Sequence, residues 1–395
     1  MKIIFLSYTY WPPNFGGELL LAEERLQDLS KRGHQIIALT AGAEGFPSTA
    51  VIDGVQVYRS PFIGKNKIAR ILRRVVFWLW SILKLLFLAK IDILHFNSLP
   101  GFEQVTSNLY GRLASWIAHK KKARTVYVLS IAGGEEIYFT QNTWEHFFLS
   151  SIDHLVCVSD GLYEAVKIKS RHKIVNAVHD ELFVPLPADV RNQIRCQNGV
   201  NDSDVIFTFL GSIGKRKGFD LIAEAFSEAA AQHKNWRLWV IGPRTRAENQ
   251  NIDEREVAQV TEPLTELGNT VKYWGRINDR SQLAEILAGS DVFVFFFFSK
   301  GMPLSPMEAM SAGLPVIISS IKGITDMINV EGETGYYIKS GDKEALKAAM
   351  LKLAEDPALR KMLGRNARQR IVEAFSWQQH VDRWEQLYRG NLNGR

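Results

Sequence analysis

The sequence predicts an α/β protein built from two doubly wound parallel sheets, and three observations support that class. Short apolar, β-branched segments alternate with longer amphipathic segments along the chain. The length of 395 residues favours two domains of ordinary size over a single core. Between the halves, Pro185 and Pro187 interrupt a stretch with neither periodicity. Because strand–helix alternation places helices on both faces of a parallel sheet, we expect two Rossmann-like domains.

The individual elements follow from local pattern. The expected strands are Lys2–Ser7, Gln35–Leu39, Ile91–Phe96, Thr125–Leu129 and His154–Val158, then Val205–Leu210, Trp236–Ile241, Thr270–Trp274, Asp291–Phe296 and Pro315–Ile318. The clearest expected helices are Gly17–Lys31, Phe219–Ala231, Ser281–Ala288, Ser305–Ala312 and an aromatic, amphipathic segment from Phe375. Ligands of such sheets bind beyond the carboxyl ends of the strands, so we expect a site in the loops that follow strands.

Composition narrows the class of protein. Apolar residues make up 46% and charged residues 23%, as in a folded globular chain. Cys157 and Cys196 are too few for a disulfide framework or a zinc cluster, which favours a reducing compartment. Met1–Leu6 is a better first strand than a secretory signal, and the apolar stretch Val75–Ala89 is too short to span a bilayer. The net charge of +6 suits nucleic acid, anionic lipid or phosphorylated ligands alike.

A glycine-containing loop from Ser299 leads into a helix. Ser305-Pro306-Met307-Glu308 has the pattern of a capping box, with proline in the first turn. Glu308 then either caps the helix, or accepts hydrogen bonds from a ribose while the helix N-terminus holds a phosphate. The spacing favours neither interpretation.

Several motifs occur in one order along nearly the whole chain. They are Pro12–Gly17, Arg32-Gly33-His34, Val158-Ser159-Asp160, Asn176–Phe183, Gly211 with Lys217-Gly218, Gly301-Met302-Pro303-Leu304, Glu308-Ala309-Met310, Ala312–Ile317 and Phe375-Ser376-Trp377. In register, they resemble the motifs of family 4 glycosyltransferases of the GT-B fold.

The resemblance implies an architecture and a reaction. Residues 1–184 would form an acceptor-binding domain and residues 185–374 a donor-binding domain, facing across a cleft, while the helix 375–395 crosses back to the first. A sugar would move, with retention of configuration, from a UDP- or GDP-linked donor to a glycan or lipid-linked acceptor in cell-surface polysaccharide or glycolipid synthesis. No metal or other cofactor is expected, because cationic side chains and a helix end can hold the diphosphate.

The same resemblance assigns the site residues. Catalytic roles fall to Lys217, Glu308 and Lys300. The donor would contact Gly16, Gly17, Ser212, Arg216, Lys217, Gly301, Met302, Pro303, Leu304 and Glu308. The acceptor side would include His95, Asn97, Ala132 and Glu135, although a structural hydrogen bond explains His95 equally well. Asp202-Ser203-Asp204 resembles a metal-binding motif but precedes a strand, so we interpret it as a solvated turn.

Three positions depart from the family's pattern. The family has a glutamate where this chain has Lys300, often an arginine where it has Ser212, and commonly a histidine where it has Ala132. Two alternatives therefore stay open. One is a catalytically weakened homologue that acts as a binding or scaffolding subunit, and the other is a nucleotide-sugar epimerase of the same architecture.

A basic, apolar segment precedes the third expected strand. No acidic residue occurs between Gly54 and Ile91, and at helical spacing Arg70, Arg73, Arg74 and Lys84 share one face, with Trp78 and aliphatic residues around them. One interpretation is a helix on an anionic membrane, with Arg70, Arg73, Arg74, Trp78 and Lys84 facing it. The other is a domain helix whose apolar side covers the sheet. Nucleic acid is a poorer partner, because the sequence contains no recognised nucleic-acid module. We expect a cytoplasmic protein that is peripheral at the inner membrane face.

Overall fold

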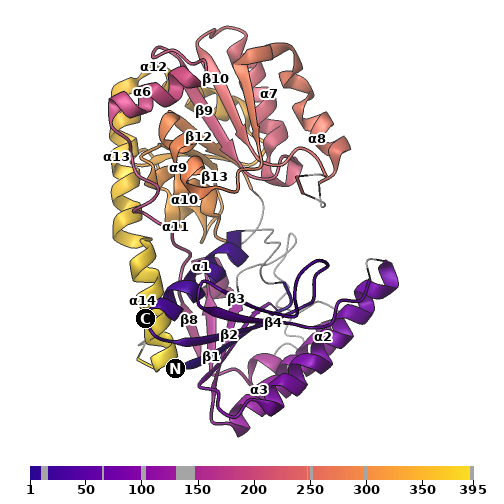
Figure 1. The fold of residues 1–395 in the computed structure, drawn as a ribbon. Coiled ribbons are helices and arrows are strands. Elements are labelled where there is room, and N and C mark those ends of the chain that lie inside the picture. Colours follow the sequence, from indigo (N-terminus) through magenta and orange to yellow (C-terminus); the bar gives the residue numbers. More distant parts are fainter. Residues whose placement is uncertain are drawn as a thin grey trace. The chain divides into compact units, whose positions relative to one another are not determined.

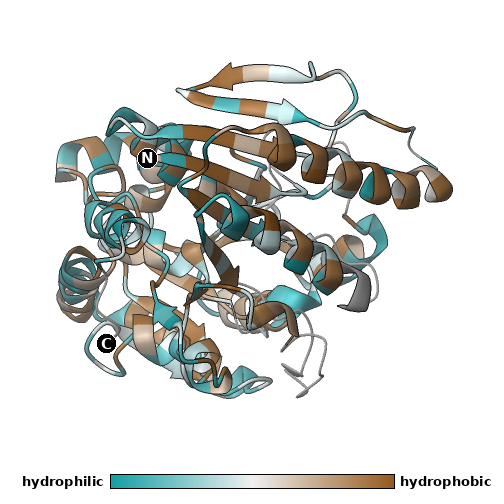
Figure 2. Cartoon of the chain, turned by 90° about the horizontal axis from the view of Figure 1, so that it is seen from below, coloured by the Kyte–Doolittle hydropathy of each residue, from teal (hydrophilic) through white to brown (hydrophobic). Residues whose placement is uncertain are grey.

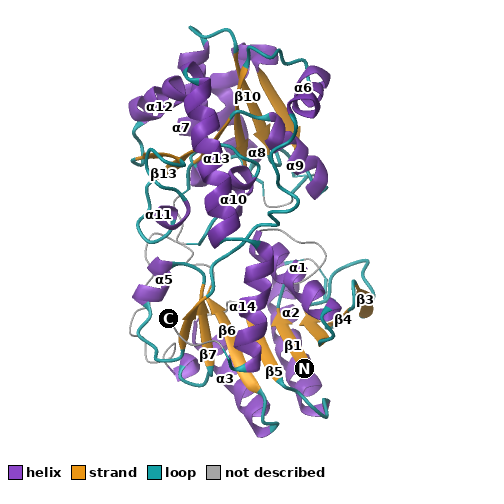
Figure 3. Ribbon diagram, turned by 90° about the vertical axis from the view of Figure 1, so that its left-hand side faces the viewer, coloured by secondary structure: helices purple, strands orange, loops and turns teal. Residues whose placement is uncertain are grey.

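The chain folds into two compact units. This computed structural model describes residues 1–9, 17–64, 66–98, 104–129, 147–246, 248–249, 252–297 and 301–391. Unit 1 comprises Met1–Asn176 with Gln378–Arg395, and unit 2 comprises Ala177–Trp377. In each unit helices lie on both faces of one mostly parallel sheet (Figures 1 and 3). The predicted α/β class with two Rossmann-like domains is confirmed.

The sheet of unit 1 has the order β3-β4-β2-β1-β5-β6-β7-β8. Its strands are β1 (Lys2–Ser7), β2 (Gln35–Thr40), β3 (Thr49–Ile52), β4 (Val55–Arg59), β5 (Ile93–Ser98), β6 (Arg124–Leu129), β7 (His154–Cys157) and β8 (Arg171–Lys173). Its helices are α1 (Gly17–Lys31), α2 (Lys67–Phe87), α3 (Gln104–Lys120), α5 (Asp160–Ala165) and α14 (Trp377–Arg389). The first residue of α14, Trp377, belongs to unit 2, and the rest of that helix belongs to unit 1. Strand β1 is almost wholly buried, as its apolar run predicts.

The sheet of unit 2 has the order β11-β10-β9-β12-β13-β14. Its strands are β9 (Val205–Leu210), β10 (Trp236–Ile241), β11 (Val271–Gly275), β12 (Val292–Phe295), β13 (Val316–Ser319) and β14 (Gly335–Ile338). Its helices are α6 (Ala188–Gln197), η1 (Lys215–Lys217), α7 (Phe219–Ala230), α8 (Glu254–Thr261), η2 (Glu262–Thr270), α9 (Arg280–Gly289), α10 (Leu304–Ser311), α11 (Thr325–Ile328), α12 (Lys343–Glu355) and α13 (Pro357–Ala374).

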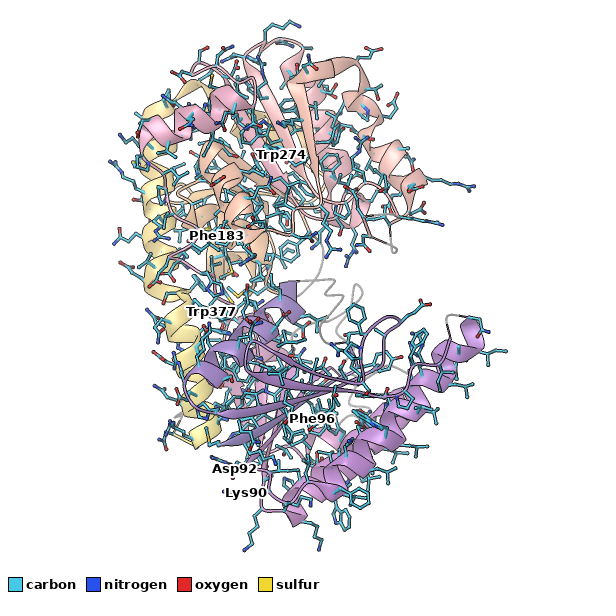
Figure 4. All side chains as sticks on the ribbon, in the orientation of Figure 1. Lys90, Asp92, Phe96, Phe183, Trp274 and Trp377 are labelled. Atoms are coloured by element: carbon cyan, nitrogen blue, oxygen red, sulfur yellow. The ribbon has the colours of Figure 1, made fainter. Side chains whose placement is uncertain are left out.

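The boundary between the units lies eight residues earlier than the expected one at 184/185. Phe183 is fully buried within unit 2 (Figure 4), where its carbonyl accepts hydrogen bonds from Ser311 Oγ (2.8 Å) and Arg368 Nη1 (2.9 Å). Val178 also forms an isolated parallel bridge with Ser376. Residues ahead of the prolines therefore already belong to the second core.

Helix α14 packs on unit 1, as the predicted architecture requires. Arg32 Nη1 donates to Asp382 Oδ1 at 2.7 Å and to Glu385 Oε2 at 2.9 Å, and His34 Nε2 lies 3.0 Å from Glu385 Oε1. His380 Nδ1 lies 2.8 Å from the carbonyl of Val175. These contacts join α14 to the turn that precedes β2 and to the segment that follows β8.

Helix α2 turns its basic side toward its own unit. The Arg73 guanidinium lies 5.3 Å from the ring centroid of Phe62, and Lys84 Nζ lies 4.9 Å from that of Tyr58. The exposed side of α2 is aliphatic, and Ile68 and Leu79 are 69% and 63% exposed. Phe77 and Leu85 of the same helix are fully buried, so only part of its apolar surface packs on the unit and the rest is exposed.

The residues predicted to face a membrane do not form its exposed side. Trp78 stacks on Tyr110 of α3 with ring centroids 5.5 Å apart. Arg74 is partly buried, and the side chain of Arg70 lies outside the described part. Arg73, Trp78 and Lys84 thus contact their own unit, and a membrane role for these residues stays a prediction. Among the described residues, no helix combines the length and apolar content that crossing a bilayer requires.

Glu385 provides a test of how α14 is attached. Hydrogen bonds from Arg389 and Arg32, with a further one from His34, lower the pKa of Glu385 to about 2 from 4.5. The carboxylate therefore stabilises the fold above pH 4.5, and this contribution is lost as pH falls toward about 2. We predict that Glu385→Gln lowers the free energy of unfolding at pH 7 by about 1–3 kcal/mol.

The difference in free energy of unfolding between Glu385→Gln and the wild type should narrow as the pH falls below 4.5. Denaturant unfolding at several pH values measures it. Glu355→Gln, at the exposed end of α12, is the matched control and should change stability little. An unchanged stability of Glu385→Gln at pH 7 would contradict the attachment.

Candidate functional site

The strand order of unit 2 reverses between β9 and β12. From β9 the chain proceeds through β10 to β11 on one side, and then returns to β12, β13 and β14 on the other. At such a switch point the loops leave their strands in opposite directions and open a crevice at the carboxyl ends. The loops that follow β9 and β12 hold most of the predicted donor residues.

Gly218 holds the β9 loop against the end of β12. Its φ of +57° is left-handed, and an added Cβ would lie 2.4 Å from Phe296 Cβ. A larger residue would therefore be strained and would push the loop away from the strand. Lys217, the preceding residue, is thereby brought over the aromatic end of β12.

Lys217 Nζ lies 5.1 Å from the ring centroid of Phe295 and 5.6 Å from that of Phe297. Burial, together with repulsion from the neighbouring Arg216, lowers the pKa of Lys217 from 10.5 to about 8. Within the described ranges, no carboxylate lies at salt-bridge distance from Lys217, so the aromatic faces are its nearest compensation. An anion in the crevice would gain from this partly desolvated ammonium.

The β12 loop leads into α10, whose start differs from the predicted one. The helix begins at Leu304 with Pro303 as N-cap, and no side chain caps it. The predicted capping box is therefore wrong. Pro306 falls in the first turn, where a backbone N–H would lack a helical acceptor anyway, so the proline is tolerated there.

Glu308 pairs with a residue from another helix. Its Oε1 accepts a hydrogen bond of 2.6 Å from Nη1 of Arg280, the first residue of α9. The Glu308 side chain is 5% exposed, so the carboxylate is almost fully desolvated and its ion pair offsets part of that cost. Arg280 itself lies over the ring of Phe183, at 4.9 Å. Glu308 is thus held as an acceptor at the start of the second turn of α10.

The other donor-side residues of unit 2 lie in the segments that follow β9 and β12. Met302 is buried, Ser212, Gly301, Pro303 and Leu304 are partly buried, and Arg216 is exposed. Lys300 lies outside the described residues.

Asp202 and Ser203 form an exposed turn, as expected from the sequence. Asp204 departs from that expectation, because it is buried and pairs with Arg237 Nη2 at 3.2 Å. No group of three or more possible metal ligands occurs among the described His, Cys, Asp and Glu residues.

Unit 1 carries the predicted acceptor-side residues, and only some are described. Gly17 is the exposed first residue of α1, and Gly16, Ala132 and Glu135 lie outside the described residues. Asn97 is buried near the end of β5, beside β1, where the strand order of this sheet also reverses.

His95 does not border an open loop. It is fully buried, and its Nδ1 lies 2.6 Å from the hydroxyl of Tyr388 on α14. Burial holds the pKa of His95 well below 6.5, so this imidazole is neutral. The structural interpretation of His95 is the one that this geometry fits.

The sequence analysis missed Arg280, Phe295 and Phe297. Phe295 and Phe297 belong to an apolar run that is typical of a buried strand. Only the strand order of the sheet shows that Lys217 comes close to them. No sequence signal joins Arg280 to Glu308, because the two lie 28 residues apart on different helices.

Comparison with known proteins agrees with this geometry. Residues 190–370 match the family "Glycosyl transferases group 1". The chain is 26% identical over 78% of its length to an Escherichia coli UDP-Gal:alpha-D-GlcNAc-diphosphoundecaprenol alpha-1,3-galactosyltransferase, of which it covers 78%.

Two solved structures share the fold over nearly the whole chain. Sucrose-phosphate synthase from Thermosynechococcus elongatus superposes with a TM-score of 0.79 at 20% identity, covering 98% of each chain. Anabaena HepE, in complex with UDP-glucose, superposes with a TM-score of 0.73 at 17% identity, covering 99% of this chain and 100% of that one. The chain therefore has the GT-B fold and is a glycosyltransferase, similar over residues 190–370 to the group 1 family.

Proposed function

We propose that this glycosyltransferase is of the family 4 type and transfers a sugar, with retention of configuration, from a UDP- or GDP-linked donor. The observation that carries the proposal is the partly desolvated ammonium of Lys217 at the switch point of unit 2. A nucleoside diphosphate is the leaving group, and its departure leaves positive charge on the sugar carbon. Lys217 would stabilise the negative charge that develops on the diphosphate.

The N-terminal half of α10 would add two kinds of contact. Backbone N–H groups of Leu304 and Ser305 have no acceptor within the helix and suit a phosphate oxygen. The Glu308 carboxylate, held by Arg280, would accept hydrogen bonds from the ribose. Lys300 would supply a second cation, and we propose that transfer needs no metal.

For the acceptor we propose a glycan or a lipid-linked glycan of a cell-surface polysaccharide or glycolipid. The E. coli relative is named for a diphosphoundecaprenol-linked acceptor, which supports the lipid-linked form. An enzyme with such an acceptor works where the lipid lies, so we place this one at the inner face of the membrane.

A panel of UDP- and GDP-sugars, incubated with and without membrane lipid extract, tests the reaction. We predict release of nucleoside diphosphate that depends on the extract and continues in EDTA, and a product with the donor's anomeric configuration by NMR. A sugar converted without acceptor would instead identify an epimerase. Donor binding without any turnover would identify a scaffolding homologue, and loss of turnover in EDTA would overturn the metal-free mechanism.

Lys217 predicts how donor affinity depends on pH. Because a phosphate favours the charged form, donor binding raises the Lys217 pKa from its free value of about 8. We predict that the association constant of UDP or GDP is constant below about pH 8 and falls about tenfold per pH unit above it.

Lys217→Met should lower this affinity about tenfold or more at pH 7 and remove the pH dependence. Calorimetry from pH 6.5 to 9.5 measures both. Lys215→Met, exposed in the same turn, is the matched control and should keep the wild-type profile. An unchanged affinity of Lys217→Met would remove Lys217 from the phosphate site.

Glu308 can be tested through the ribose. If its carboxylate accepts from a ribose hydroxyl, the wild type should bind the 2′-deoxy or 3′-deoxy nucleotide about tenfold or more weakly than the parent nucleotide. Glu308→Gln should discriminate less between the parent and that deoxy form, because its amide oxygen accepts a weaker hydrogen bond than the carboxylate.

The matched control for this cycle is Glu285→Gln, an exposed position on α9. It should keep the wild-type discrimination. If Glu308→Gln discriminates as strongly as the wild type, the carboxylate does not contact the ribose.

A further inference from the structure

Helix α2 exposes an aliphatic stripe along its whole length. Residues three and four apart share one side of a helix, and the exposed set here follows that spacing. Its members are Ile68, Ile71, Leu72, Val75, Leu79 and Leu83. Leu86 continues the stripe, and Phe87 at the helix end is 85% exposed. Figure 2 colours most turns of α2 as hydrophobic.

Helix α3 extends this surface. Ser81 of α2 and Tyr110 of α3 are joined by a hydroxyl–hydroxyl hydrogen bond of 2.7 Å, so the two helices lie side by side (Figures 1 and 2). Leu109, Leu113 and Trp116 of α3 are exposed at helical spacing, Trp116 to 55%. We call these exposed side chains of both helices the α2–α3 surface. Most of the exposed large hydrophobic side chains among the described residues lie on it.

Charge at this surface has one sign. The sequence has no acidic residue from Gly54 to Ile91 or from Gln104 to Leu129, and both helices lie within these segments. Lys120 and Lys122 are exposed where α3 ends, and no carboxylate in the described part of the chain lies within salt-bridge distance of either. Lys120 Nζ lies 5.6 Å from the ring centroid of Trp116, so a cation adjoins the exposed indole.

These cations are not uniformly free. Lys121 Nζ donates to the carbonyls of Leu86 (3.0 Å) and Leu88 (2.7 Å), which ties α3 to the end of α2. Lys90 lies 3.5 Å from Asp92 (Figure 4). Lys120 and Lys122 therefore remain as the cations best placed to meet an external anion.

We propose that the α2–α3 surface binds an anionic lipid bilayer, with its aliphatic side chains entering the boundary between head groups and acyl chains. Aliphatic side chains, an exposed indole and lysines at the rim suit that boundary. A second copy of this chain is a poorer fit, because it would bring two surfaces without acidic residues together.

Membrane binding deepens the proposed function and rests on it in one respect: a lipid-linked acceptor would explain why this protein needs to bind a membrane. It also changes the expected mode of binding. Aliphatic insertion from the exposed side of α2 replaces the purely basic face that the sequence indicates, and the lysines of α3 supply the attraction to anionic lipid.

The test is vesicle co-sedimentation of the full chain with phosphatidylglycerol–phosphatidylethanolamine and with phosphatidylcholine vesicles. We expect the wild type to prefer the anionic vesicles, and the variant Leu79→Gln/Leu83→Gln/Trp116→Gln to bind them at least about tenfold more weakly. All three positions are already exposed, so the fold should tolerate the changes.

Two further variants sharpen the test. Val190→Gln/Met362→Gln/Val372→Gln makes three matched changes at exposed apolar positions of unit 2 and should bind like the wild type. Lys120→Glu/Lys122→Glu should lose the preference for anionic lipid. Brominated lipid should quench tryptophan fluorescence in the wild type, and less in Trp116→Phe.

Three results would overturn the proposal: no binding by the wild type, wild-type binding by the Leu79/Leu83/Trp116 variant, or a dimer in light scattering that this variant dissociates. The shift in melting temperature caused by the donor is measured in parallel. Vesicle binding without a donor-induced shift in melting temperature would contradict the proposed function and support the membrane-binding surface. A donor-induced shift without vesicle binding would support the proposed function and contradict the membrane-binding surface.

Discussion

The ammonium of Lys217, held over Phe295 and Phe297 at the switch point of the second sheet, is the interaction on which the account of the donor site depends. Carrying this cation partly out of water costs free energy, which appears as its lowered pKa. The packing of Gly218 against Phe296 keeps it there. This desolvation is unfavourable while the site is empty, and a bound diphosphate would offset it. A charge positioned in advance in this way is what preorganised electrostatic stabilisation requires.

In the proposed site, Glu308 and Arg280 would extend the same arrangement to the ribose. The ion pair positions a carboxylate that would otherwise be costly to bury, while α10 keeps uncapped N–H groups at its start. Lys217 follows β9, the start of α10 and Glu308 follow β12, and Arg280 follows β11, all at the carboxyl edge of one sheet. A doubly wound sheet brings such groups together without requiring them to be close in sequence.

Much of the fold could be predicted because buried parallel strands carry a strong local signal, and β1, β9 and β10 have the predicted bounds. The hairpin of β3 and β4 was missed although its turn is Asp53-Gly54, with φ of 47° and 82°, a pairing typical of tight hairpins. The exposed side of α2 could not be predicted. Periodicity separates the faces of a helix, and only tertiary packing decides which one turns inward. The partners of Glu308 and Lys217 depend on packing in the same way.

We thus propose two separate roles for basic and apolar groups in this chain: a nucleotide-sugar site in unit 2 and a lipid-binding α2–α3 surface in unit 1. The most direct test of the donor site is an NMR titration of the Lys217 side chain, whose signal is assigned by comparison with a variant lacking it. The account predicts a pKa of about 8 in the free protein and a higher value with nucleoside diphosphate bound. An ordinary value near 10.5, unchanged by the nucleotide, would contradict it.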